Sequence, residues 1–301
     1  MPEKYTFAIL GGDMRQIVIA KMLLALGHSV RVFGLNGFPA SAVKTEYCLS
    51  VKKAIEGCDA VILPLPVSRD SKSLNQPIGD KIEPVSLEDI VNEAAKNNNK
   101  LIIGGIIPDS MKEVAKKHGV TVEDYYAYDD LQQKNALPSA EGALMLAMEN
   151  SATVIDGMEV LVTGYGKTGI LIAEQLRALG AHVSVAARRD EVLCEIAMNG
   201  FDTDHINDEK EMTTTVDRCE IIINTVPHIV FTKKILHDCK NVPLYIEIAS
   251  APGGIDIPTA RSLGIRLIFA PSLPGKYAPV SAGKYIFETI SDILRKGGIN
   301  I

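Results

Sequence analysis

Short apolar runs alternate along the chain with longer segments whose apolar residues recur at a helical period. Residues 5–10 form an apolar run, and residues 17–26 have apolar positions spaced around 3.6 residues. Gly11 and Gly12 stand between the two segments. The pattern therefore predicts a strand, a glycine turn and a helix.

The same pattern occurs twice. Residues 160–188 repeat the order seen in residues 8–34, and both helical segments end with Ala-Leu-Gly, at Gly27 and Gly180. Later apolar runs also correspond in pairs, which are 58–67 with 219–228 and 100–109 with 244–254. Short, continuous apolar strands alternating with helices are typical of parallel sheets covered on both faces. The sequence predicts an α/β protein with two Rossmann-like, doubly wound parallel-sheet domains and an interdomain cleft.

A short segment joins the two copies. Pro138 and Ser139 suggest a break and a helix N-cap, and residues 141–150 then predict a helix that links the domains. The final amphipathic helix is a candidate to pack back on the first domain. The expected divisions are therefore an N-terminal domain of residues 1–138, a C-terminal domain of residues 139–301, and the returning helix within 281–301.

The second glycine turn has the complete fingerprint of a dinucleotide-binding loop, and it lies between an apolar strand and a helix. The first glycine permits the turn, the second lets the backbone approach a pyrophosphate, and the third lets helix and strand pack closely. The helix N-terminus attracts the phosphates. The alternative is a glycine turn without a ligand. The predicted cofactor-binding residues are Gly164, Tyr165, Gly166, Lys167, Thr168 and Gly169.

The end of the next strand predicts which dinucleotide binds. An NAD enzyme usually places Asp or Glu about 20 residues beyond the glycines, whereas this chain has Ala187, Arg188 and Arg189. Guanidinium groups suit a 2′-phosphate, so the pattern favours NADP. The alternative is that both arginines are solvated surface residues. Later strand ends at the same edge supply the remaining cofactor candidates, which are Asn224, Thr225, Val226, Pro227 and Ala249.

The first glycine turn, GGDMRQ, lacks two of the fingerprint glycines. Asp13 and Gln16 stand in their places, so side chains fill the space that a pyrophosphate needs. The loop still precedes a helix and adds Arg15, a combination that favours a smaller anion such as a carboxylate. The alternative is that Arg15 only forms a salt bridge or faces water. Arg69 is a second cationic candidate at the same edge.

Two further segments are expected to face the cleft. One is the start of the linker helix, and the other is the Pro- and Gly-rich segment 270–283, which ends on a candidate N-cap serine. The alternatives are a rigid structural turn for this segment and a structural role for the histidine that follows Pro227. The candidate catalytic residues are Glu141, His228 and Lys276, with Glu141, His228 or a water as the base. The candidate substrate-binding residues are Asp13, Arg15, Arg69, Ser139 and Ser281.

Composition argues against several classes of partner. The formal net charge is −6 and no basic block offsets it, so neither nucleic acid nor an anionic membrane is an expected partner. The sequence shows no secretion signal and no apolar run long enough to span a bilayer. The five cysteines are scattered and the histidines lack ligand spacing, so we expect reduced thiols and no metal. A cytoplasmic protein is expected.

Together these motifs resemble the A subunit family of dipicolinate synthase from endospore-forming bacteria. The resemblance covers essentially the whole chain and rests on GGDMRQ, LPSAEGAL, GYGKTG, AARR and LPGKYAPVSAG. It implies an oxidoreductase of sporulation, acting in the mother-cell cytoplasm. Its substrate would be a dihydrodipicolinate-level intermediate of the lysine pathway, oxidised to pyridine-2,6-dicarboxylate with hydride transfer to NADP. The implied partner is a flavodoxin-like B subunit, and we expect a homo-oligomer.

Two other functions stay open at this point. One is an NADP-dependent dehydrogenase of the shikimate or methylenetetrahydrofolate type, acting on another small acid. The other is an NADP-binding regulatory or structural subunit that completes the B partner and has no chemistry of its own. The Arg/Glu/His set of 2-hydroxyacid dehydrogenases is not recognisable in this chain, which argues against that activity.

Overall fold

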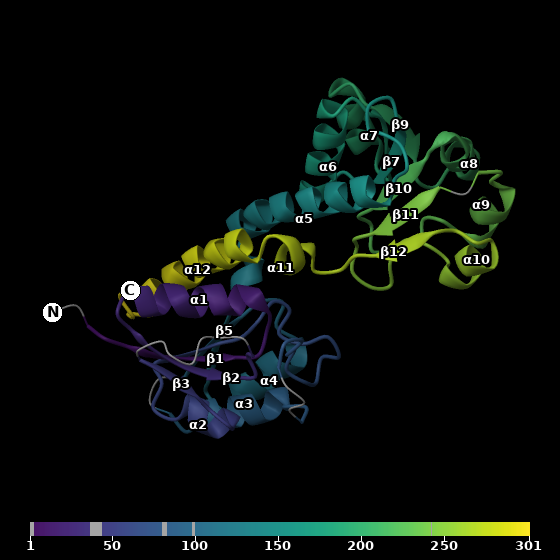
Figure 1. The fold of residues 1–301 in the computed structure, drawn as a ribbon. Coiled ribbons are helices and arrows are strands. Elements are labelled where there is room, and N and C mark those ends of the chain that lie inside the picture. The colour runs from purple at the N-terminus through teal and green to yellow at the C-terminus, as the bar shows by residue number, and fades with distance from the viewer. Residues whose placement is uncertain (1–2, 37–43, 80–82, 98–99, 242) are drawn as a thin grey trace. The chain divides into compact units, whose positions relative to one another are not determined.

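The computed structural model describes residues 3–36, 44–79, 83–97, 100–241 and 243–301. The chain divides into two compact units, one of Met1–Lys134 with Ala278–Ile301 and the other of Asn135–Tyr277 (Figure 1). The division falls between Lys134 and Asn135, inside one helix.

The first unit is built on a parallel sheet with the strand order β3-β2-β1-β4-β5-β6. Its strands are β1 (Thr6–Leu10), β2 (Ser29–Phe33), β3 (Thr45–Tyr47), β4 (Ala60–Ile62), β5 (Leu101–Gly104) and β6 (Thr121–Asp124). Its helices are α1 (Met14–Ala25), α2 (Val51–Ile55), α3 (Leu87–Ala94), α4 (Asp109–Lys117), the 3₁₀ turn η1 (Tyr125–Ala127) and α12 (Pro279–Lys296).

Both faces of this sheet are buried. On β1, Phe7 and Ile9 belong to the core cluster that α1 and α12 complete. Ala8 and Leu10 belong to the cluster on the other face, which α2, α3 and α4 complete. Because successive strand residues point to opposite faces, a strand covered on both sides must be apolar throughout. This is why the strand sequences are continuous apolar runs.

Helix α12 returns to the first unit and lies along α1 (Figure 1). A Cβ added at Gly283 would come within 2.7 Å of the Cβ of Val18 and 3.0 Å of the carbonyl oxygen of Arg15. The two helix backbones therefore approach closely at this glycine.

The second unit has the strand order β12-β11-β10-β7-β8-β9, again parallel throughout. Its strands are β7 (Glu159–Thr163), β8 (His182–Ala187), β9 (Asp202–His205), β10 (Ile221–Asn224), β11 (Leu244–Glu247) and β12 (Leu267–Phe269). Its helices are α6 (Lys167–Ala178), α7 (Asp190–Met198), α8 (Glu209–Arg218), α9 (Lys233–Asp238), α10 (Ile257–Ser262) and α11 (Leu273–Tyr277). Read from β9, the strand order matches that of the first sheet. The predicted pair of doubly wound parallel sheets is confirmed.

The expected helix break at Pro138 is wrong. Helix α5 runs from Asp129 to Asn150 with Pro138 inside it. Ser139 is an interior residue rather than an N-cap, and its hydroxyl donates to the carbonyl of Asn135 at 3.0 Å. A proline inside a helix typically costs about 3 kcal/mol. Burial of the alanines that follow, Ala140, Ala143 and Ala147, in the core of the second unit offsets this loss.

The expectation that segment 270–283 ends on a serine N-cap is also wrong. The segment contains α11 and the first turn of α12, which begins at Pro279 with Ala278 as N-cap. Ser281 is an exposed residue inside the helix. Proline suits the first position of a helix because its φ is already helical and its missing N–H would be unpaired there.

Candidate functional site

The glycine fingerprint of the second unit lies between β7 and α6, at the carboxyl edge of the sheet. Gly164 has a φ of +92°, and its N–H donates to the carbonyl of Ala186 at 2.8 Å. A Cβ at Gly169 would overlap the carbonyl oxygen of Gly164. The fold itself therefore requires the first and third glycines.

Gly166 differs from the other two fingerprint glycines. It is the exposed N-cap of α6, its φ is −92°, and a Cβ there would meet nothing within 4 Å. Among the described residues, no side chain caps α6. The N-terminus of this helix thus faces open space, which is the arrangement that a pyrophosphate needs.

In the first unit, the equivalent loop is closed by its own side chains. Asp13 is the N-cap of α1 and accepts a hydrogen bond from the backbone N–H of Arg15 at 3.0 Å. Gln16 is buried, and a Cβ at Gly12 would overlap its side chain. A carboxylate of the chain therefore sits where an anion would sit at α6.

Asp13 also pairs with the guanidinium of Arg15. The Nε and one terminal nitrogen of Arg15 donate to the two carboxylate oxygens at 2.9 and 2.8 Å. The same terminal nitrogen donates to the carbonyl of Leu65 at 2.5 Å. The exposed fraction is 6% for the Arg15 side chain and 21% for that of Asp13. The salt bridge that the sequence left as an alternative is thus formed, and a substrate role for either residue stays a prediction.

The arginines expected to select NADP follow the end of β8. Ala187 is the last, buried residue of that strand, and Arg188 and Arg189 are exposed beyond it. Arg189 is the N-cap of α7. Both guanidinium groups therefore leave the sheet at the same edge as the glycine fingerprint.

A buried polar network joins the ends of β7, β10 and β11. The amide nitrogen of Asn224 donates to the carbonyl of Val226 at 2.9 Å and to the carboxylate of Glu247 at 2.7 Å. The amide oxygen of Asn224 accepts from the hydroxyl of Thr163 and from the N–H of Val226. The hydroxyl of Thr225 donates to the carbonyl of Thr163 at 2.7 Å. The predicted turn after β10 is therefore held rigidly beside the first fingerprint glycine.

Glu247, at the end of the same segment as Ala249, is not among the site residues predicted from the sequence. Its exposed fraction is only 3%, although it is acidic and ends an apolar strand. The signal was available, because a single carboxylate inside the run LYIEI must find buried partners.

The three candidate catalytic residues are exposed and do not form one cluster. Glu141 lines a groove on the second unit together with Tyr277 of α11. A Cβ at Gly142 would come within 3.2 Å of Tyr277, so α5 and α11 are close there, and α11 carries Lys276. His228 lies in the loop after β10 instead. None of these three roles is tested by the geometry, and they stay predictions.

The substrate candidates are divided between the units. Asp13, Arg15 and Arg69 follow strand ends at the carboxyl edge of the first sheet, and Arg69 is exposed. Ser281 lies on α12 in the same unit, whereas Ser139 lies in the part of α5 that belongs to the second unit.

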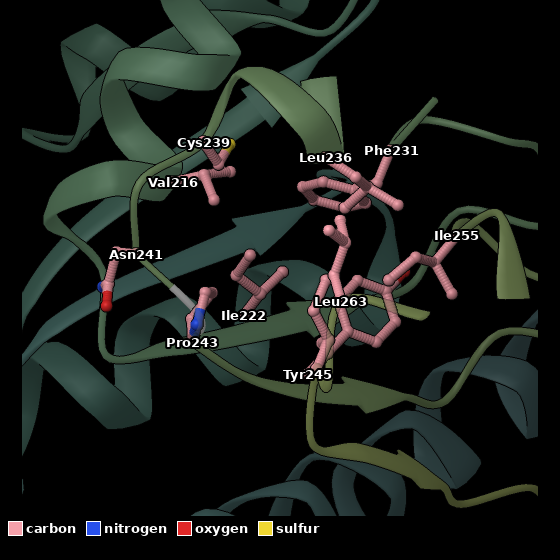
Figure 2. A pocket seen from close by; sticks show the side chains of 11 residues that line it. Val216, Ile222, Phe231, Leu236, Cys239, Asn241, Pro243, Tyr245, Ile255 and Leu263 are labelled. Atoms are coloured by element: carbon pink, nitrogen blue, oxygen red, sulfur yellow. The ribbon is translucent and has the colours of Figure 1, made fainter. Parts of the chain in front are cut away.

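A separate apolar cavity of about 70 Å³ lies inside the second unit (Figure 2). Figure 2 shows Ile222 and Tyr245 from the sheet facing Leu236 and Val216 from α9 and α8. Its lining offers few polar groups, which a nucleotide site needs in addition to apolar surface. We interpret this cavity as packing space within the core.

The buried thiols are poor nucleophiles. Burial raises the pKa of Cys58 to about 11 and that of Cys219 to about 12. Both therefore stay protonated at neutral pH, and the thiol form is unreactive. Within the described part of the chain, no three His, Cys, Asp or Glu side chains come together to hold a metal ion. The described helices include none that is long and apolar enough to cross a membrane.

Comparison with known proteins agrees with this architecture. Residues 6–126 match a family model described as the N-terminal domain of the A subunit of dipicolinate synthase. The A subunit of dipicolinate synthase from Bacillus subtilis is 29% identical over 287 residues, covering 95% of each chain. The chain is similar to the dipicolinate synthase A subunits over nearly its whole length. The resemblance predicted from the sequence motifs is confirmed.

Solved structures of these relatives share the whole fold. The Bacillus subtilis protein has a TM-score of 0.81 at 28% identity, covering 98% of this chain and 97% of that one. The Bacillus halodurans protein has a TM-score of 0.81 at 27% identity, covering 96% and 97%. D-lactate dehydrogenase from Escherichia coli has the same general fold, with a TM-score of 0.62 at 14% identity over 97% of each chain.

Proposed function

We propose that this chain is the redox subunit of a dipicolinate synthase. It oxidises a dihydrodipicolinate-level intermediate to pyridine-2,6-dicarboxylate, and the hydride passes to NADP. The observation that carries the proposal is the contrast between the two glycine turns in a chain similar to the dipicolinate synthase A subunits. The turn at Gly166 is open above a helix N-terminus, whereas Asp13 closes the equivalent turn.

The residues of the second unit fit a dinucleotide. The backbone at Gly166 and the N-terminus of α6 would hold the pyrophosphate, since among the described residues a Cβ at Gly166 meets nothing within 4 Å and no side chain caps the helix. Arg188 and Arg189 would hold the 2′-phosphate. The turn from Asn224 to Pro227 would border the nicotinamide half. When bound, NADP supplies the hydride acceptor, and the chain supplies binding and orientation.

The first unit would bind the carboxylates of the substrate. Arg15 and Arg69 both follow strand ends at one edge of its sheet. A guanidinium has five N–H donors. In the described structure, the hydrogen bonds of Arg15 use Nε and one terminal nitrogen. We assign the other terminal nitrogen to a substrate carboxylate, with Asp13 holding the guanidinium in a fixed orientation.

The reaction removes a hydride from one ring carbon and a proton from another position, which leaves an aromatic ring and NADPH. Aromatisation favours this direction, so the chain mainly has to place the substrate and accept the proton. Glu141, His228 or a water are the proposed bases, and Lys276 is proposed to orient a carboxylate or the proton acceptor.

The relatives are A subunits of a synthase, which also supports a second, different subunit in the working enzyme. We propose that this partner is a flavodoxin-like B subunit. We also propose that the chain forms a homo-oligomer and works in the cytoplasm. These proposals rest on the family resemblance.

The function is tested by mixing the purified chain, NADP⁺ and freshly prepared dihydrodipicolinate. We expect the absorbance band of NADPH to rise with this chain alone. An increase in NADPH absorbance only when the B subunit is present would favour the alternative, in which this chain binds NADP and completes the B partner without chemistry of its own. Product formation that does not depend on a nicotinamide nucleotide would refute the proposed function.

Removal of the two arginines after β8 should change cofactor preference. We expect Arg188→Ala combined with Arg189→Ala to weaken NADP binding by about tenfold or more and to leave NAD binding within about twofold. Titration calorimetry with each dinucleotide measures both values. Arg261→Ala, which removes an exposed arginine on α10, is the control and should alter neither. Equal weakening of NADP and NAD would show that the arginines do not recognise a 2′-phosphate.

A further inference from the structure

Glu247 is a buried carboxylate with an unusually complete set of donors. It accepts hydrogen bonds from the amide of Asn224 at 2.7 Å and from the N–H of Ala249 at 3.0 Å. It also accepts from the N–H of Gly254 at 2.7 Å and from the hydroxyl of Tyr245 at 3.2 Å. All four partners donate to the carboxyl oxygens of Glu247, two to each oxygen.

These donors come from separate segments of the carboxyl edge. Ala249 and Gly254 belong to the loop after β11, and Asn224 ends β10 and holds Val226 of the next loop. The N–H of Val230 in that loop donates to the carbonyl of Gly254 at 2.8 Å. Glu247 therefore links the loop after β10 to the loop after β11.

The backbone of the loop after β11 packs closely against the carboxylate of Glu247. Gly253 has a φ of +83°, and a Cβ there would lie 2.9 Å from a carboxylate oxygen of Glu247. A Cβ at Gly254 would overlap the amide of Asn224. Only glycine lets the backbone approach this closely.

The same network reaches the glycine fingerprint. A Cβ at Gly164 would overlap the hydroxyl of Thr225, the residue that follows Asn224. The hydroxyl of Thr225 therefore packs against the first fingerprint glycine, and the hydrogen bonds of Asn224 and Glu247 continue from this turn to Gly254.

The donors around Glu247 explain why an acid ends an apolar strand. The preceding residues of β11, from Leu244 to Ile246, are buried and mainly apolar. An apolar residue in place of Glu247 would remove the acceptor of the loop N–H groups of Ala249 and Gly254, and a buried donor without a partner is destabilising. No ion pair to Glu247 is found among the described residues. The carboxylate therefore acts through the hydrogen bonds that fix the conformation of these loops.

We propose that Glu247 is a positioning residue that holds the loops of residues 225–228 and 249–254 against the nicotinamide half of the dinucleotide. This inference rests on the proposed function, because it takes the second unit as the NADP-binding unit. Glu247 acts through the loop backbones.

The test compares two ligands that differ in the nicotinamide ring. NADPH carries this ring, whereas 2′-phospho-ADP-ribose lacks it and keeps the 2′-phosphate, the pyrophosphate and both riboses. We expect Glu247→Gln to weaken NADPH binding by about tenfold and 2′-phospho-ADP-ribose binding by less than about twofold. The reason is that the glutamine N–H₂ group would face N–H or O–H donors that now bind a carboxylate oxygen, which would displace the loops. Glu113→Gln is the matched control. It makes the same chemical change at an exposed residue of α4 in the first unit, and it should leave both affinities within about twofold of wild type.

If Glu247 has only a general structural role, Glu247→Gln should weaken the binding of both ligands equally. That result, or unchanged affinity for both ligands, would overturn the inference and leave the proposed function standing. Wild-type protein that binds neither NADPH nor NADH would refute the proposed function and the inference with it.

If Glu247→Gln does not fold, amide hydrogen exchange of the wild-type protein tests whether the two loops contact the nicotinamide. NADPH should protect residues 225–228 and 249–254 more than 2′-phospho-ADP-ribose does. Equal protection by the two ligands would contradict the proposed role of Glu247.

Discussion

Replacing Gly166 by alanine is expected to weaken NADP binding by about 100-fold, equivalent to about 2.7 kcal/mol, and to leave the fold intact. The added Cβ meets nothing within 4 Å in the part of the chain that the structure describes, and the φ of −92° suits any residue. The methyl group would instead occupy the space through which the backbone approaches the pyrophosphate. Titration calorimetry measures the affinity, and thermal unfolding measures the stability.

Two further glycine variants make this result specific. Gly169→Ala should lower the melting temperature as well, because its Cβ would overlap the carbonyl oxygen of Gly164. Gly297→Ala, at the exposed end of α12, should change neither stability nor NADP affinity by much, since its nearest contact would be 3.4 Å away. Unchanged NADP affinity in Gly166→Ala would show that the pyrophosphate does not sit at this turn.

Removing the side chain of Arg15 should impair the use of the substrate and leave the binding of the cofactor unchanged. We expect Arg15→Ala to lower kcat/KM for the dihydrodicarboxylate by about 100-fold, as for loss of a charge-assisted contact. NADP affinity should stay within about twofold of wild type. Steady-state kinetics at saturating NADP⁺ and a separate NADP titration give the two values.

Asp13→Asn separates substrate binding from the salt bridge. Both variants remove the Asp13–Arg15 ion pair, but asparagine keeps the Oδ1 acceptor that caps the helix and binds Nε of Arg15, so the guanidinium keeps its orientation. If Arg15 contacts substrate, Asp13→Asn should retain kcat/KM within about threefold. If Arg15 serves only the salt bridge, the two variants should lose activity to a similar degree, and the assignment to substrate would be wrong.

The two doubly wound parallel sheets and the glycine turn between strand and helix were predictable because each leaves a local pattern in the sequence. Strands buried on both faces are apolar at every position, and the glycines at 164 and 169 have no sterically possible substitute. The family resemblance was predictable for the same reason, since its motifs are short and contiguous.

The errors came from elements that tertiary packing decides. Pro138 is a breaker by propensity, yet α5 continues because the residues that follow it are buried in the second unit. Pro279 begins α12 rather than preceding it, which moves Ser281 inside the helix.

Glu247 and Arg15 show what a single sequence leaves undetermined. The partners of Glu247 include Asn224, on a neighbouring strand 23 residues earlier. No local pattern reports such a pairing. Asp13 lies only two residues before Arg15, and the sequence could not tell whether it capped the helix or paired with the arginine. The geometry shows that one carboxylate does both.

The central claim is that the glycine turn of residues 164–169 binds the dinucleotide, whereas the turn of residues 11–16 binds a carboxylate of the substrate. Amide hydrogen exchange with each ligand in turn tests this claim most directly. Saturating NADP⁺ should slow exchange at residues 164–170 and leave residues 11–17 unchanged, whereas pyridine-2,6-dicarboxylate should slow exchange at residues 11–17. Protection of residues 11–17 by NADP⁺, or none at residues 164–170, would contradict the account.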